Sequence, residues 1–212
     1  MEVFDCIESR SSVRRYEKKE VSNELIGKII YAGTQAPSAG NLQPWEFIVV
    51  KDEKLKKELT EASLRQSHIE NAPVVIVVCA NPEKSEDRYG DRGRTLYCIQ
   101  DTAAAIENML LTANDSSLGA CWISAFDEEE VKDILNIPER LRPIAIITLG
   151  FPISHEKPTK KSRIPFEKIT WVDKHGKHFP WFEHYAGEWK LKIRPLEEHV
   201  KKIKEKLNKK SK

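Results

Sequence analysis

The sequence APSAGNLQPWEF occupies residues 36–47 and separates a helical pattern from the first strand pattern of the chain. Gly40 permits a close approach of the backbone to a ligand, and Asn41 and Gln43 each carry both a hydrogen-bond donor and an acceptor. These groups suit the polar edge of a planar heterocycle such as the pyrimidine half of a flavin ring. An ordinary loop of turn-forming residues is the structural alternative, but a loop built only for turning rarely needs the Gln-Pro-Trp found here.

Helical and strand patterns alternate on both sides of this loop. Helices are predicted from apolar residues at helical spacing, and Ser22 provides an N-cap for the second helix. Strands are predicted from short runs rich in Val and Ile. The predicted elements are helices at 2–9 and 22–35, a strand at 46–50, a helix at 52–64, a strand at 73–79, a helix from Leu96 that Gly119 ends, a strand at 120–124, a helix at 127–135 and a strand at 144–149.

The last part of the chain follows a different pattern. Residues 151–194 have no clear period, and 195–209 return to a lysine-rich amphipathic helix. A long tail with few core positions usually packs on another surface. The whole pattern predicts an α+β domain over 1–165, followed at 166–212 by an arm that packs on a partner subunit.

Bulk composition excludes several classes of protein. The 212 residues include 35 Lys and Arg against 33 Asp and Glu, so a net charge of +2 gives no indication of nucleic-acid binding. The start lacks a basic segment followed by an apolar run, and no apolar stretch approaches the roughly 20 residues that span a bilayer, so we expect a cytoplasmic protein without a membrane segment. The four cysteines are scattered, and we interpret them as small buried residues rather than metal ligands. The histidines favour surface positions over a metal site.

The segment RSSVRR at residues 10–15 concentrates three guanidinium groups and two hydroxyls in six positions. Arginine offers forked donors that match phosphate oxygens, and serine adds short hydrogen bonds to the same anion. The segment therefore predicts a phosphate site, with a solvated basic turn as the alternative.

Five blocks of sequence together resemble the nitroreductase family in their order and spacing, over roughly residues 3–170. They are the SRSSVRRY segment, the APSAGNLQPWEF loop, the helical DTAAAIEN beginning at Asp101, LGACWI beginning at Leu118, and LGFP beginning at Leu149. The resemblance implies a central, mainly antiparallel sheet of four to five strands flanked by helices, with the C-terminal arm exchanged with the dimer partner.

The resemblance also implies a homodimer that holds FMN between its subunits. One group of residues is expected to bind the phosphate and ribityl chain, a second to meet the ring from the opposite subunit, and a third to cover one ring face with a backbone N–H directed at N5. Gln66 is expected at the pyrimidine edge. The phosphate group comprises Arg10, Ser11, Ser12, Arg14, Lys161 and Arg163; the opposing loop comprises Pro37, Ser38, Asn41 and Gln43; the ring face comprises Trp122, Ile123, Ser124 and Ala125.

The activity implied is a two-step oxidoreduction, in which NADH or NADPH gives a hydride to the flavin and a small nitroaromatic, quinone or similar acceptor then takes its place. No catalytic side chain is required. Residues 83–94 do not match the added lid residues of specialised branches such as reductive dehalogenases, which favours generic reduction. The alternatives are a flavin-binding protein without turnover and a structural dimer with a nucleic-acid-binding tail. Trp171, Trp181 and Trp189 are expected to pin the arm to its partner rather than to line the substrate site.

Overall fold

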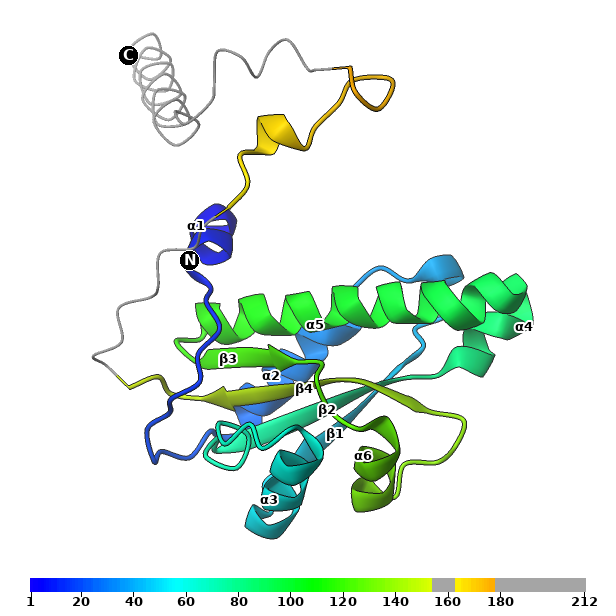
Figure 1. The fold of residues 1–212 in the computed structure, drawn as a ribbon. Coiled ribbons are helices and arrows are strands. Elements are labelled where there is room, and N and C mark those ends of the chain that lie inside the picture. The colour runs from blue at the N-terminus through cyan, green and yellow to red at the C-terminus, as the bar shows by residue number, and fades with distance from the viewer. Residues whose placement is uncertain (154–162, 178–212) are drawn as a thin grey trace, which may run out of the picture. The chain divides into compact units, whose positions relative to one another are not determined.

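The computed structural model describes residues 1–153 and 163–177. The chain divides into two compact units, Met1–Thr159 and Lys160–Lys212, and each is described by itself. In the first unit, four strands form one antiparallel sheet in the order β1-β2-β4-β3, with helices on both faces (Figure 1). The predicted α+β class and the antiparallel sheet are confirmed. The elements are α1 Val3–Ser9, α2 Asn23–Thr34, η1 Ala39–Asn41, β1 Trp45–Val50, α3 Glu53–Ala62, β2 Val74–Ala80, α4 Pro82–Arg92, η2 Gly93–Tyr97, α5 Cys98–Asp115, β3 Gly119–Ile123, α6 Glu128–Leu135, β4 Arg142–Gly150 and η3 Phe166–Lys168.

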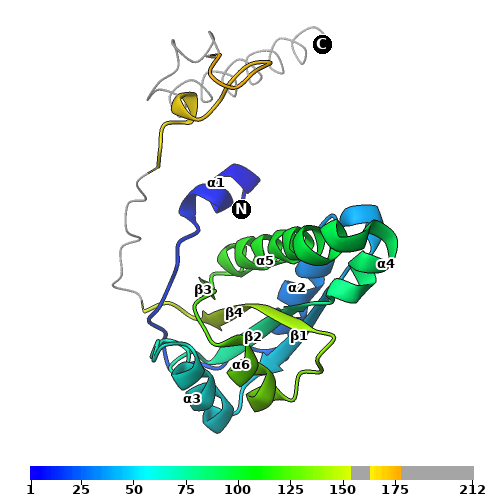
Figure 2. The same cartoon turned by 45° about the vertical axis from the view of Figure 1, so that its right-hand side comes forward.

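Strand β2 is the centre of the core, and all seven of its residues are buried. Val75 and Val77 point into the cluster formed with α3 and α6, whereas Ile76 points into the cluster formed with α2 and α5. The turned view shows the same two helical layers on opposite faces of the sheet (Figure 2). Because β2 is covered on both faces, its sequence is a continuous apolar run rather than an alternating one.

Helix boundaries follow capping residues. The Ser22 hydroxyl accepts a hydrogen bond from the Leu25 N–H at 3.3 Å, as predicted, and Asp127 accepts from two N–H groups at the start of α6. One predicted boundary is wrong. Helix α5 ends at Asp115, and Gly119 is the first residue of β3. Ser117 adopts a left-handed backbone with φ of 60° and so ends the helix before the glycine is reached.

Residues 82–97 form an element that the sequence did not reveal. Pro82 lies at the first turn of α4, and the Asn81 side chain accepts a hydrogen bond from the Lys84 N–H at 3.2 Å. The π-helical turn η2 then joins α4 to α5. Gly90 interrupts the α4 geometry with φ of 61° and ψ of −152°, so no uninterrupted helical period was visible in this charged stretch.

Helix α1 contacts α5 through few groups. The Cys6 thiol donates to the Leu111 carbonyl at 3.2 Å, and the Asn114 amide donates to the Cys6 carbonyl at 3.1 Å. The apolar side chains of Phe4 and Ile7 remain 51% and 48% exposed. This face of α1 is therefore available to another surface.

In the second unit, the described residues include η3 and a turn in which the Val172 N–H donates to the Lys177 carbonyl at 2.9 Å. The Trp171 ring lies 5.0 Å from the His175 ring, measured between centroids. The predicted helix at 195–209, together with Trp181 and Trp189, lies outside the described residues. Among the helices of the described residues, none combines the length and apolar character that a membrane span requires.

Gly119 leaves room for the segment that precedes α2, because a Cβ atom at this position would lie 2.7 Å from the Val13 Cβ. We predict that Gly119→Ala lowers the free energy of unfolding by about 1–3 kcal/mol, since neither backbone can retreat easily. Gly27→Ala is the matched control. Its Cβ would meet nothing within 4 Å, and the change should stabilise α2 by about 0.5–1 kcal/mol. Urea unfolding of both variants measures the difference, and a Gly119→Ala protein as stable as the parent would contradict this packing.

Candidate functional site

Residues 10–16 lie along the outer edge of β3. The Val13 N–H donates to the Ala120 carbonyl at 2.9 Å, and Ser12 forms a parallel bridge with the same residue. Tyr16 is buried and forms an antiparallel bridge with Pro152. The arginine- and serine-rich segment is therefore held as an extended strip beside the sheet.

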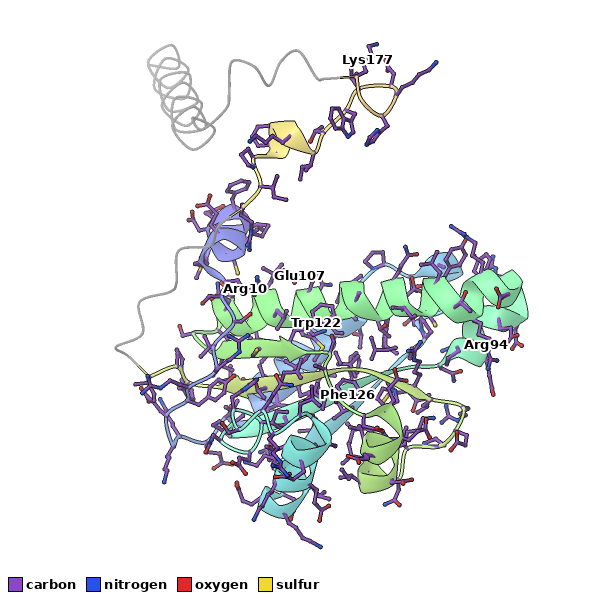
Figure 3. All side chains as sticks on the ribbon, viewed as in Figure 1. Arg10, Arg94, Glu107, Trp122, Phe126 and Lys177 are labelled. Atoms are coloured by element: carbon purple, nitrogen blue, oxygen red, sulfur yellow. The ribbon has the colours of Figure 1, made fainter. Side chains whose placement is uncertain are left out.

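The functional side chains of this strip converge around the start of β3. Arg14 and Ser12 both act on the buried Cys121 thiol: burial raises the pKa of this thiol, while the Arg14 guanidinium and the Ser12 hydroxyl lower it. Arg10 approaches from the end of α1, and its Nε lies 3.7 Å from a carboxylate oxygen of Glu107 on α5 (Figure 3). Three of the four phosphate-binding residues predicted on this segment thus act on one place.

The strip carries more positive charge than its surroundings neutralise. Arg14 is exposed, and in residues 1–153 and 163–177 no carboxylate pairs with its guanidinium. His68 lies near Arg14, and its Nε2 atom is buried without a hydrogen-bond partner in the described structure. Burial, and to a lesser extent the Arg14 charge, lower the pKa of His68, so this ring stays neutral near pH 7. The site offers donors for an anion and one unused polar nitrogen beside them.

The end of β3 leads directly from this strip to the predicted ring face. Because alternate residues of a strand direct their peptide groups to opposite edges, Trp122 directs its N–H to the same outer edge as Ala120. The Trp122 indole N–H donates to the Ser124 hydroxyl at 2.8 Å. The Gln66 amide donates to the Ala125 carbonyl at 3.0 Å, which joins Gln66 to residues 122–125.

The loop between α2 and β1 is held in an unusual conformation. Asn41 and Gln43 have φ of 57° and 52°, a backbone region that side chains other than glycine seldom adopt. The Gln43 N–H donates to the Ser38 hydroxyl at 3.0 Å, and the Ala39 N–H donates to both carboxylate oxygens of Asp101 at 3.1 and 3.2 Å. These bonds order the loop while leaving the Asn41 and Gln43 side chains exposed.

The two groups of residues attach to different parts of α5 within one subunit. Asp101 holds the loop, whereas Glu107 meets Arg10 six residues later. Six residues correspond to about 9 Å along the helix axis and to a different face of the helix. The loop and the arginine strip are therefore attached to α5 at separate places.

Most predicted site residues are placed by the structure, and two are not joined to the rest. Pro37, like Asn41 and Gln43, is exposed on the loop, Ser11 is half-buried on the strip, and Ile123 is buried in the core below the edge of β3. Lys161 lies outside the described residues. Arg163 lies in the second unit, so its place beside the phosphate group stays a prediction.

Sequence reasoning missed two residues that this geometry singles out. Asp101 was noted only as part of a helical block, and its carboxylate is the anchor of the loop. His68 was grouped with surface histidines, although it is half-buried. Its position two residues after Gln66, in the turn before an apolar strand, was the available signal.

The cysteines are not arranged for nucleophilic chemistry. All four are buried, as predicted, and burial raises the pKa of Cys79 to about 12 and that of Cys98 above its ordinary value. Such thiols stay protonated near neutral pH. Within the described ranges, no group of three or more His, Cys, Asp or Glu side chains has the arrangement of a metal site.

Comparison with known proteins gives one consistent family. A sequence model described as Nitroreductase family matches residues 7–67 and 61–151. A putative NADH dehydrogenase/NAD(P)H nitroreductase of Archaeoglobus fulgidus is 38% identical over 155 residues, which are 71% of this chain and 86% of that protein. A crystal structure with the same description from Parabacteroides distasonis is 30% identical, with a TM-score of 0.72 over 82% of this chain and 99% of that one. An FMN-dependent nitroreductase of Clostridium difficile is 26% identical, with a TM-score of 0.69 over 81% and 99%.

Asp101 provides a direct test of how the loop is held. We predict that Asp101→Leu lowers the free energy of unfolding by about 1–3 kcal/mol, because the Ala39 N–H is left unpaired. Asp101→Asn keeps an acceptor oxygen and should cost less.

The pH dependence of these variants has a defined sign. Burial raises the pKa of Asp101, so the folded state binds a proton more tightly than the unfolded state. The charged carboxylate therefore opposes folding, and this cost appears as the pH rises through the raised pKa. Urea unfolding between about pH 3 and pH 7 should show this loss in the parent and not in Asp101→Asn. If Asp101→Asn lost stability with rising pH as the parent does, the pH dependence could not be assigned to the Asp101 carboxylate.

Proposed function

The chain belongs to the nitroreductase family, and we propose that it is an FMN-dependent oxidoreductase that takes reducing equivalents from NADH or NADPH and reduces a small organic acceptor. The observation that carries the proposal is the strip of residues 10–14 along β3, where guanidinium groups and hydroxyls converge on one place and no carboxylate of the described residues pairs with Arg14. The named relatives support the donor, since they include proteins described as NAD(P)H nitroreductase and NADPH-dependent oxidoreductase.

The residues of the strip fit the phosphate of FMN. Arg10, Ser12 and Arg14 supply forked and single donors to an anion with several oxygens, and Ser11 adds a hydroxyl. The neutral His68 has a buried nitrogen that no described residue bonds, which leaves one more hydrogen-bonding position beside the same anion or its ribityl chain. Lys161 and Arg163 are proposed as further cationic members of the phosphate-binding group.

The end of β3 and the loop fit the ring of the flavin. The outward peptide N–H of Trp122 offers a donor at the sheet edge, and Ser124, Ala125 and Gln66 continue the same surface. Bound FMN would supply the chemistry of hydride acceptance and electron transfer. The protein residues would hold and orient the cofactor.

We propose that two subunits complete each site, with the loop of one subunit meeting the ring held by the other. Within one subunit the loop and the strip attach to different faces of α5. The exposed apolar residues Val3, Phe4 and Ile7 of α1 provide surface for such an association. A groove of about 400 Å³ between α2 and α5, which includes the exposed Tyr31, provides more.

The arm of residues 166–212 is proposed to cover the partner at the free edge of β1. Among residues 1–153 and 163–177 this strand is paired on one side only, and Val49 is 39% exposed on it. Beside it lies a groove of about 390 Å³ lined by residues of β1, α3 and α6, including Leu55 and Ile134. An open strand edge next to an apolar groove suits the addition of an extended segment.

Removing one guanidinium should weaken cofactor binding. Arg10→Ala is expected to raise the dissociation constant for FMN by the equivalent of about 1.5–3 kcal/mol, because a charge-assisted bond to phosphate is lost. Lys18→Ala, an exposed lysine after the same strip, is the matched control and should bind FMN like the parent. Fluorescence titration of the apoprotein with FMN measures both affinities.

The same preparation distinguishes turnover from binding alone. The parent should show flavin absorbance that bleaches with NADH or NADPH under anaerobic conditions and returns when a quinone is added. Bound flavin that neither nucleotide reduces would indicate a binding role without turnover. In the FMN titration, equal affinity in Arg10→Ala and the parent would contradict the assignment of Arg10 to the FMN phosphate.

A mixed dimer tests whether the site lies between subunits. One subunit carries Arg10→Ala and Arg14→Ala, the other carries Asn41→Ala and Gln43→Ala, and two affinity tags select the heterodimer. A shared site predicts one intact site of two, and therefore about half of the parental activity, although each homodimer is inactive. A heterodimer no more active than the two variant homodimers would mean that the loop and the strip of the same subunit form each site.

A further inference from the structure

An array of two arginines and two tyrosines lies on α4 and η2, outside the roles assigned so far. The rings of Tyr89 and Tyr97 have centroids 5.3 Å apart and an interplanar angle of 76°. The Arg88 guanidinium lies 5.5 Å from the centre of the Tyr89 ring, and the Arg92 guanidinium lies 5.6 Å from that of Tyr97. Arg92 Nε also donates to the Tyr97 hydroxyl at 3.1 Å.

Backbone irregularities produce this array. Gly90 leaves helical geometry, and η2 is a π-helical turn, which lets the rings of Tyr89 and Tyr97 meet although they are eight residues apart. The turn is tightly packed, because a Cβ atom at Gly93 would collide with the Ser85 carbonyl. Single π-helical turns are frequent at functional sites. The array is thus built into a fixed turn.

The two arginines of the array lack counter-charges, unlike their neighbour Arg94. Arg94 pairs with Glu86 at 2.7 Å, and Glu83 and Asp91 also act on it. Arg88 and Arg92 are exposed, and no carboxylate of the described residues pairs with either. Each guanidinium keeps unused forked donors and so suits an oxyanion, while the tyrosine rings suit a flat partner.

The array is attached to the loop of the proposed flavin site. Arg88 Nη1 donates to the Gly40 carbonyl at 3.2 Å, and a Cβ atom at Gly40 would lie 2.5 Å from the Tyr89 hydroxyl. Lys84 donates to the Gln43 carbonyl at 3.2 Å. A ligand that reaches the loop with one ring can therefore extend onto the array with another part.

We propose that Arg88, Tyr89, Arg92 and Tyr97 bind a phosphate group of the nicotinamide nucleotide donor while its nicotinamide ring reaches the loop at Ser38–Gln43. This inference rests on the proposed function. The phosphate has two sources in this ligand class: the pyrophosphate, which NADH and NADPH share, and the 2′-phosphate, which NADPH alone carries.

Arg92→Gln is the test variant, because Arg92 has no bond to the loop and its loss should not disturb the flavin half-site. Arg94→Gln, an exposed arginine of the same turn that is paired with Glu86, is the matched control. In the flavin-loaded parent and both variants, KM is measured for NADH and NADPH with a quinone as acceptor. We expect Arg92→Gln to raise the KM for NADPH, or for both donors, roughly tenfold with little change in kcat. Arg92→Lys should give a KM between those of the parent and Arg92→Gln, since lysine keeps the charge and loses the forked donors of the guanidinium.

The pattern of change identifies the phosphate. A rise for NADPH alone assigns the array to the 2′-phosphate, and an equal rise for both donors assigns it to the pyrophosphate. No rise for either donor, or the same rise in Arg94→Gln, overturns the proposal.

Calorimetry separates this inference from the proposed function. ADP-ribose carries the pyrophosphate, 2′-phospho-ADP-ribose carries both groups, and neither requires turnover. We expect one of these compounds to bind the parent, and Arg92→Gln but not Arg94→Gln to weaken the binding roughly tenfold. This result supports phosphate binding by the array even if the protein fails to reduce an acceptor. Absence of binding to a protein that does oxidise NADPH would overturn the array and leave the proposed function intact.

Discussion

The burial of β2 and β4 between two helical layers is the constraint on which the rest of the structure depends. Val75 and Val77 pack toward α3 and α6, and Ile76 and Ile147 pack toward α2 and α5, so both faces of the sheet are used for the core. A ligand the size of a nucleotide cannot reach either face without removing apolar contacts worth about 25 cal/mol for each Å². Polar chemistry is therefore confined to the edges of the sheet and to the loops at its ends.

The outer edge of β3 is partly covered by residues 10–16, and the candidate site lies beside the covered part. Residues 10–16 cover part of the outer edge of β3, through the bridge between Ser12 and Ala120, which limits unwanted pairing with other chains. The same strip carries Arg10 and Arg14, so one segment both protects the edge and supplies the cationic groups. Past Ala120 no residue in the described part of the chain pairs with this edge, and the first peptide group that faces outward there belongs to Trp122. The open part of the edge is thus next to the positive charge.

Much of the fold was predictable because local patterns and the final packing agree. The strand at 46–50 and the helix at 127–135 were found within one or two residues of β1 and α6, since their apolar periods and caps are intact. The segment 82–97 was missed because the break at Gly90 and the π-helical turn destroy any regular period. Gly119 was read as a helix terminator, but its role is to admit Val13, a contact with a residue more than 100 positions away. The candidate site residues were proposed from sequence and their binding roles stay predictions, whereas the anchoring role of Asp101 is visible only in the tertiary structure.

The loop before β1 is held by groups of α4 and α5 that lie outside the loop. Left-handed backbone at Asn41 and Gln43 costs of the order of 1–3 kcal/mol for each residue, and the exposed loop buries too little apolar surface to offset this cost. Hydrogen bonds from outside the loop stabilise it instead: the Asp101 carboxylate holds the Ala39 N–H, and Arg88 and Lys84 hold two of its carbonyls. The conformation that directs Asn41 and Gln43 outward is consequently a property of the helices that flank the loop. A change in α4 should alter the presentation of the Asn41 and Gln43 amides while leaving the arginine strip on β3 undisturbed, because none of the bonds that hold the loop involves the strip.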